Sequence, residues 1–263
     1  MTSYHVHSRW SDGAATIEEI VREAERLGLE EIGISDHLVL YPYGSHIEWS
    51  MPVDRLGEYV DEVLAASRFA RSARVRLGIE VDYLPETIES VRELLRPYPF
   101  DYVIGSVHFI DGFPVDEHRR YWDTLSPEMV NETWRGYYAR VADMARSRVF
   151  DIAAHLDLPK KFGHSPTADL SEEVHAVLDA VAASDMAIEI NTSGWHQPAN
   201  EAYPAPWIIR AARSREVPIV ITADAHNPKY LIRGYGDAHK LAREAGHTAV
   251  ARYHLRKRLS VPI

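Results

Sequence analysis

The feature that most constrains the fold is a regular alternation of short apolar segments with longer amphipathic ones, repeated seven times along the 263 residues. Runs such as YVIGSV and IVIT are typical of strands that are buried on both faces. The longer segments carry apolar residues at i, i+3 and i+4, the spacing of a helix that packs on a core. We therefore expect seven βα units and a parallel sheet closed into a barrel, with an open doubly wound sheet as the alternative.

The expected strands are 4–7, 31–37, 75–81, 102–109, 150–155, 186–191 and 218–222. The amphipathic segments between and after them predict helices at 17–27, 56–64, 86–95, from 127 onward, 174–181, 206–215 and 230–245. Thr16 and Glu19 have the spacing of a capping box, Gly28 can end the first helix, and Ser126 precedes a proline at the first helical position. Two aromatic-rich stretches, 40–51 and 111–125, are expected to be loops that could wall a cleft.

Composition excludes several classes of protein. The 39 acidic residues outnumber the 29 basic ones, and a net charge of −10 argues against a dedicated nucleic-acid binder. The absence of cysteine excludes disulfides, thiolate zinc sites and a cysteine nucleophile, and it fits a cytoplasmic protein. No apolar run approaches the ~18 residues of a membrane span. The start, MTSYHVHSRW, does not resemble an export signal. We expect residues 1–263 to form a single domain.

Almost every expected strand ends in a residue that can bind a metal ion. In a parallel barrel the carboxyl ends of all strands meet at one mouth, so these side chains are expected to converge. In strand order they are His5, His7 and Asp12; Asp36 and His37; Glu80 and Asp82; His108; His155 and Asp157; Asn191; and Asp224 and His226.

The spacing of these residues favours a cluster of ions over a single one. Residues two apart in a strand point to the same face, so His5 and His7 can reach one ion, and so can Asp224 and His226. Imidazole and carboxylate ligands suit zinc, manganese or iron. Even nine ligands from this set are too many for one ion, whereas a carboxylate such as Glu80 can bridge two. We expect two or three divalent ions, an arrangement that serves phosphoryl transfer and hydrolysis. The remaining histidines are expected to be peripheral: His46, His118, His164, His175, His239, His247 and His254.

The chain resembles the PHP (polymerase and histidinol phosphatase) family. The likeness lies in five ordered blocks, which are HVHSRWSDG at 5–13, ISDH at 34–37, GIEVDY at 78–83, GSVHF at 105–109 and TADAH at 222–226. The stretches AAHLDLPKKFG and NTSGW are similar to the branch that hydrolyses L-histidinol phosphate in histidine biosynthesis. The resemblance implies a distorted, seven-stranded, TIM-like βα barrel with three divalent metals. It also implies attack on phosphorus by a metal-activated hydroxide.

The resemblance also implies a distribution of ligands. His5, His7, Glu80 and Asp224 would hold the first ion, Glu80, His108 and His155 the second, and Asp12, His37 and His226 the third. Within this set, we expect Glu80, His108, Asp224 and His226 to take part in catalysis. Asp36 and Asp157 are expected to orient ligand histidines, and Asn191 is expected to contact the substrate or support a ligand.

The basic residues near strand ends are candidates for binding the phosphate. They are Lys160, Lys161, His196 and Arg233, with Asn191 as a further substrate contact. Many members of the family place a basic residue, often arginine, after NTSGW, where this chain has His196, a weaker and pH-dependent anchor. The expected partner is a small phosphorylated substrate, with neither a nucleic-acid polymer nor a membrane.

Three alternatives stay open at this point. The first is a related phosphoesterase that acts on a nucleotide or another small phosphate ester. The second is an amidohydrolase-type barrel, which also begins with HxH but usually needs a strand-end lysine where this chain has His108. The third is a metal-binding protein without catalytic activity.

Overall fold

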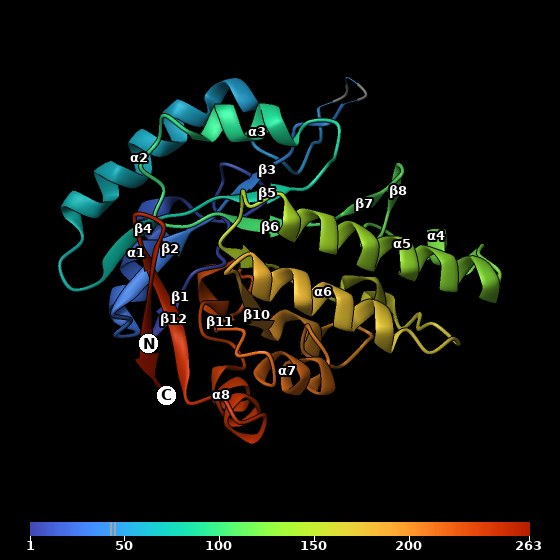
Figure 1. Ribbon diagram of the computed structural model, residues 1–263. Coiled ribbons are helices and arrows are strands. Elements are labelled where there is room, and N and C mark those ends of the chain that lie inside the picture. Colours follow the sequence, from blue (N-terminus) through green and yellow to red (C-terminus); the bar gives the residue numbers. More distant parts are fainter. Residues whose placement is uncertain (43, 45) are drawn as a thin grey trace.

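The computed structural model describes residues 1–42, 44 and 46–263 and contains a parallel barrel with helices on its outside (Figure 1). One sheet has the order β1-β2-β4 and a second has the order β11-β10-β9-β6-β5-β3, with all neighbours parallel. Their bounds are β1 (Thr2–Ser3), β2 (Glu31–Ile34), β3 (His37–Leu38), β4 (Arg74–Leu77), β5 (Glu80–Asp82), β6 (Ile104–Ser106), β9 (Ile152–Ala153), β10 (Ala187–Asn191) and β11 (Ile219–Thr222).

Backbone hydrogen bonds join these two sheets into one closed ring. β2 continues into β3 and β4 into β5, and the Glu80 amide donates to the Asp36 carbonyl at 3.1 Å across the interruption. On the other side, Val6 pairs with Ala225, and the amide of Ala225 donates to the carbonyl of His5 at 3.0 Å. The ring therefore has seven strand positions, which confirms the predicted seven-stranded barrel.

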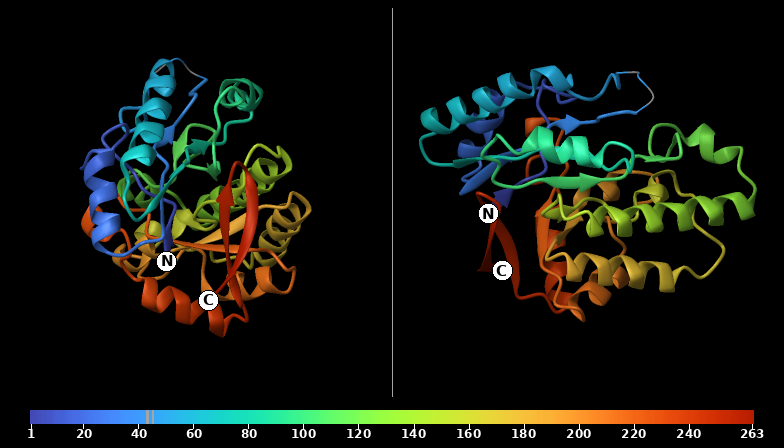
Figure 2. Two further views of the ribbon diagram at one scale, coloured as in Figure 1. Left: turned by 90° about the vertical axis from the view of Figure 1, so that its left-hand side faces the viewer. Right: turned by 45° about the horizontal axis from the view of Figure 1, so that its top comes forward.

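The helices surround the barrel (Figure 2). They are α1 (Ile17–Arg26), α2 (Leu56–Phe69), α3 (Ile88–Leu95), α4 (Arg119–Asp123), α5 (Pro127–Arg146), α6 (Ser171–Ala183), α7 (Pro206–Arg213) and α8 (Tyr235–Glu244). Short 3-10 turns follow several strands: η1 (Val53–Arg55), η2 (Leu158–Phe162), η3 (Thr192–His196) and η4 (Pro228–Tyr230). None of the helices in the described part of the chain is long and apolar enough to cross a lipid bilayer.

The predicted helix ends are confirmed. Thr16 and Glu19 form a reciprocal capping box at the start of α1. Gly28, with a φ of 69°, follows the end of that helix, where a left-handed conformation favours glycine. The Ser126 side chain accepts a hydrogen bond from the amide of Met129 at the start of α5.

Two parts of the structure differ from the prediction. The stretch 111–125, expected to be irregular, contributes to a hairpin of β7 (Phe109–Ile110) and β8 (Phe113–Pro114) and contains α4. The last residues form an unpredicted antiparallel hairpin of β12 (Ala249–His254) and β13 (Lys257–Pro262). His247, just before this hairpin, lies outside the ligand cluster as expected, but it is buried instead of solvated, with its Nε2 3.2 Å from the carbonyl oxygen of Ile209.

Tyrosines and the C-terminal hairpin close the amino-terminal end of the barrel. The rings of Tyr4 and Tyr102 stack with centroids 4.9 Å apart, and the Tyr102 hydroxyl donates to the Tyr4 carbonyl. Tyr253 of the hairpin donates its backbone amide to the Tyr4 hydroxyl, and Figure 2 shows the hairpin lying across this end. Position 78 requires a glycine, because a Cβ there would lie 2.2 Å from the ring of Tyr102. Because this end of the barrel is closed, a site that opens to solvent must lie at the opposite, carboxyl end of the strands.

Candidate metal centre

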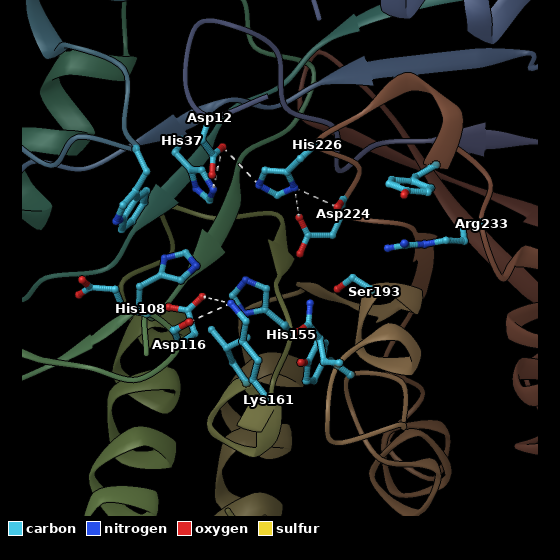
Figure 3. Close-up of a pocket in the computed structure, with 16 residues that line it drawn as sticks. Asp12, His37, His108, Asp116, His155, Lys161, Ser193, Asp224, His226 and Arg233 are labelled. Atoms are coloured by element: carbon cyan, nitrogen blue, oxygen red, sulfur yellow. Dashed lines mark hydrogen bonds and ion pairs between the residues drawn. The ribbon is translucent and has the colours of Figure 1, made fainter. Parts of the chain in front are cut away.

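The structure brings the nine predicted ligands together at the carboxyl end of the barrel. Figure 3 shows six of them around one cleft, namely Asp12, His37, His108, His155, Asp224 and His226. Glu80, which is fully buried, lies at the centre of the cluster and contacts histidines from four other segments. Three sets of donor atoms lie within 4.8 Å of one another: His7, Asp12, His37 and His226; His5, His7 and Glu80; and His37, Glu80 and His108.

The first group combines His5 and His7 with two carboxylates. Oε2 of Glu80 lies 3.1 Å from Nε2 of His5 and 3.6 Å from Nε2 of His7. Oδ1 of Asp224 lies 3.3 Å from Nε2 of His7 and 3.7 Å from Nε2 of His5. The two histidines share a face because the chain is extended where Val6 pairs with Ala225.

The second group uses the other oxygen of Glu80. Its Oε1 lies 3.2 Å from Nε2 of His155 and 4.0 Å from Nε2 of His108. Glu80 thus presents one carboxylate oxygen to each of two groups, which is the arrangement that a bridging ligand requires.

The third group lies nearer to solvent. Oδ1 of Asp12 lies 3.3 Å from Nε2 of His226 and 3.8 Å from Nε2 of His37. His37 also joins this group to the centre, because its Nδ1 lies 2.7 Å from Oε2 of Glu80.

Three observations fit a metal cluster. The Nε2 atoms of His5 and His7 are buried, and neither has a hydrogen-bond partner among the described residues. Buried polar atoms are almost always paired, so these two nitrogens fit the role of ligands to a metal ion. Asp224 adopts a left-handed φ of 49°, a strained conformation that is typical of functional sites. The donor set of imidazole and carboxylate suits zinc, manganese or iron.

The electrostatics keep the central histidine neutral. Burial lowers the pKa of His7 to about 3, and the neighbouring His226 and His37 add to this effect. His7 stacks between these two rings, with centroids 4.1 and 4.2 Å away, so a charge on it would be repelled from both sides. A neutral imidazole keeps the lone pair that a metal needs.

Glu189 is a buried support of the centre that the sequence analysis missed. Its carboxylate lies 2.9 Å from Nδ1 of His5 and accepts from Nδ2 of Asn191 at 2.7 Å. It also accepts from the Thr222 hydroxyl and the His155 amide, both at 3.3 Å. The sequence contains a signal for this role, because a glutamate inside the apolar run AIEIN of a buried strand needs buried polar partners.

The two aspartates that were expected to orient ligand histidines have other partners, so that prediction is wrong. Asp36 accepts hydrogen bonds from the backbone and side chains of Ser8 and Ser11, which fixes the loop that carries Asp12. Asp157 binds the Lys160 ammonium at 2.8 Å and the amide of Ala205.

The candidate metal centre opens into a cleft of about 410 Å³. Of the basic residues predicted to bind substrate, Lys161 and Arg233 line this cleft, and Figure 3 shows Arg233 pointing into it from the side of Ser193. Lys160 instead lies behind the wall, where its ammonium contacts Asp157, Glu201 and the carbonyl of Ala202 at 2.7–2.8 Å.

The other two predicted substrate residues do not line the cleft either. Asn191 is buried and donates from Nδ2 to Glu189 and, at 3.2 Å, to Asp224, so it supports a ligand carboxylate. His196 is exposed at the end of η3. Asp116, which the sequence analysis did not single out, lines the cleft and binds the Lys161 ammonium at 3.0 Å.

Known proteins resemble this chain in sequence and in fold. A relative from Deinococcus radiodurans, named a probable histidinol-phosphatase, is 38% identical over 95% of both chains. The histidinol-phosphatase of Lactococcus lactis is 25% identical over 95% of this chain and 93% of its own. The crystal structure of the L. lactis enzyme with zinc, L-histidinol and phosphate aligns over 98% of both chains, with a TM-score of 0.82 at 22% identity.

The range matched by a family model includes most of the candidate site. The PHP domain family matches residues 3–193, a range that includes seven of the nine clustered ligands. The remaining two, Asp224 and His226, contact ligands of the matched part at 3.3 Å each. The chain therefore belongs to the PHP domain family.

Proposed function

We propose that the protein hydrolyses the phosphomonoester L-histidinol phosphate to L-histidinol and phosphate. The observation that carries this proposal is the meeting of nine histidine and carboxylate side chains in three groups around Glu80. Similarity to the D. radiodurans relative over nearly the full chain supports the substrate. So does the content of the L. lactis structure, which holds L-histidinol and phosphate.

The ligand groups would hold up to three divalent ions, of zinc, manganese or iron. His5, His7, Glu80 and Asp224 would hold the first ion, Glu80, His108 and His155 the second, and Asp12, His37 and His226 the third. When bound, such ions supply the positive charge that polarises a phosphoryl group and promotes ionisation of the attacking water. Of these ligands, Glu80, His108, Asp224 and His226 are proposed to act closest to the reaction.

The protein's own cations would hold the substrate phosphate. Arg233 is steadied by the ring of Tyr230, whose centroid lies 4.1 Å from the guanidinium carbon. The Lys161 ammonium is held by the carboxylate and the carbonyl of Asp116, and both cations line the cleft. We leave Lys160, Asn191 and His196 out of the proposed substrate contacts, because none of them lines the cleft. We propose that residues 1–263 form one catalytic domain.

The test is an elemental analysis of the purified protein together with a small panel of phosphomonoesters. We expect bound zinc, manganese or iron, and a kcat/KM for L-histidinol phosphate well above that for nucleoside 5′-monophosphates. Chelation should abolish the activity and added metal should restore it. A higher kcat/KM for the nucleotides would show that L-histidinol phosphate is not the preferred substrate. Full activity after exhaustive chelation would refute the metal-dependent mechanism.

The variant Glu80→Gln tests the bridging role. Because Glu80 faces two groups, we expect it to lose ions from both together and to lose at least about 10³-fold in kcat. Glu31→Gln is the matched control, because Glu31 is a buried glutamate at the opposite end of the barrel that binds Tyr4 and Arg76. Its metal content and kcat should stay normal at temperatures where circular dichroism shows a folded protein. Wild-type turnover in Glu80→Gln would exclude the bridge.

A further inference from the structure

The hydroxyl of Tyr203 is an unexplained feature of the cleft. Tyr203 is only 1% exposed and lines the same cleft as Lys161 and Arg233. Its hydroxyl is buried and has no hydrogen-bond partner among the residues that the structure describes. Since buried hydroxyls are nearly always paired, an unpaired one in the wall of a binding cleft points to a partner that arrives from outside.

The ring of Tyr203 is held in place from several directions. Its backbone pairs with Asn191, at the end of β10, through hydrogen bonds of 2.7 and 3.0 Å. Its ring packs on Gly194, where a Cβ would lie 2.9 Å from Cε2. The Lys160 ammonium lies 5.4 Å from the ring centroid, which gives this lysine a role behind the wall. The hydroxyl is therefore a fixed donor, and little ordering is needed when a ligand binds.

The surroundings of the hydroxyl favour donation. Burial raises the pKa of Tyr203, and the carboxylates of Asp157, Asp224 and Asp116 raise it further. The group therefore keeps its proton at any physiological pH and is a poor proton donor in the chemical step. It can instead donate a hydrogen bond to an acceptor, and the cations in the same cleft attract one that is negatively charged.

We propose that the hydroxyl of Tyr203 donates a hydrogen bond to a phosphoryl oxygen of the substrate. This inference rests on the proposed phosphatase function, because it takes the ligand of the cleft to be a phosphate group. Tyr203 lies outside the recognisable sequence motifs. It is also not adjacent in sequence to any of the proposed metal ligands.

The test compares Tyr203→Phe with Tyr253→Phe in the metal-loaded protein. Tyr253 is the matched control, because it is also a buried tyrosine but donates to the carbonyl of Asp151 at the closed end of the barrel. Inorganic phosphate is the probe, and its binding is measured by isothermal titration calorimetry. In Tyr203→Phe we expect a loss of phosphate affinity and of kcat/KM of about 10- to 100-fold, the range for a hydrogen bond to a charged group.

Thermal unfolding separates this role from a structural one. Tyr203→Phe removes an unpaired hydroxyl, so its Tm should equal or exceed that of the wild type, whereas Tyr253→Phe should have a lower Tm and normal phosphate binding. Unchanged phosphate affinity in Tyr203→Phe, or a loss that comes with a lower Tm, would overturn the inference. If the wild type binds phosphate but does not hydrolyse L-histidinol phosphate, the proposed function fails by itself, and the binding comparison still decides the role of Tyr203.

Discussion

The buried carboxylate of Glu189 is expected to set which nitrogen of His5 carries the proton. Its Oε2 lies 2.9 Å from Nδ1 of His5, so a proton on Nδ1 is bound there and the lone pair of Nε2 faces Glu80. A metal-binding histidine commonly gives its second ring nitrogen to such a carboxylate, which fixes the tautomer and the orientation of the ring.

The variant Glu189→Gln should weaken the preference for this tautomer. Gln can keep an acceptor oxygen for Asn191 and His155, but its NH₂ group then faces Nδ1 of His5. Nδ1 then faces the NH₂ donor at the 2.9 Å position and the amide oxygen at the 3.2 Å position, so a proton on Nδ1 is held less firmly. The tautomer with the proton on Nε2, whose lone pair is lost to a metal, becomes more favourable. We expect the first ion to bind about 10- to 100-fold more weakly, which is about 1.4 to 2.8 kcal/mol, with a similar loss in kcat/KM.

The assay is a competition titration of the metal against a chromogenic chelator, with the imidazole tautomer of His5 read by NMR. Thr222→Val is the control, because it removes a weaker donor to the same carboxylate, at 3.3 Å, and leaves the partner of His5 in place. Its metal affinity should change by less than about threefold, since the carboxylate oxygen that faces Nδ1 of His5 stays in place. Equal metal affinity in Glu189→Gln and wild type, with Nε2 of His5 unprotonated in both, would refute the reasoning.

Two further predictions concern the closed end of the barrel. Gly78→Ala should lower the free energy of unfolding by about 3 kcal/mol in urea titrations, because its Cβ would lie 2.2 Å from the fully buried Tyr102 ring. Gly236→Ala, in a helix with nothing within 4 Å, should be neutral or stabilising, and equal effects of the two variants would contradict the packing argument. The Arg252 guanidinium beside Glu30 lowers the pKa of that carboxyl to about 2, so the contact adds stability above the ordinary pKa and loses it as the pH falls toward 2. Arg252→Gln should raise the Glu30 pKa in an NMR titration, and an unchanged value would assign the shift elsewhere.

The barrel and the convergence of the candidate ligands could be predicted from the sequence because both depend on short-range periodicity. Alternation identifies the strands, and the rule that parallel strands share one mouth then gathers His5, Glu80 and Asp224 without further information. Their distances follow from the pairing of Val6 with Ala225, which closes the ring.

The direction of side chains beyond the strand ends could not be predicted in the same way. Lys160 and Lys161 are neighbours in sequence, yet one supports the ring of Tyr203 behind the wall and the other lines the cleft, because the 3-10 turn η2 points them apart. Tyr203 itself reaches the site through an isolated bridge to Asn191, a long-range contact with no local pattern. The C-terminal hairpin was missed for a related reason, since it packs on the end of the barrel instead of adding to its ring.

The two ends of the barrel differ in how their buried polar groups are paired. At the closed end, the hydroxyls of the buried tyrosines are paired: Tyr4 donates to Glu31, Tyr102 to the carbonyl of Tyr4, and Tyr253 to the carbonyl of Asp151. At the open end, the Nε2 atoms of His5 and His7 and the hydroxyl of Tyr203 are buried but unpaired, so this end is unfavourable for folding by itself. A chain can keep such a surface only if the packing elsewhere compensates, and a ligand that satisfies these atoms must then stabilise the fold. Single unpaired atoms also occur elsewhere in the described residues, but the group gathered around this cleft marks the site, because several such atoms together leave the fold less stable until a ligand binds.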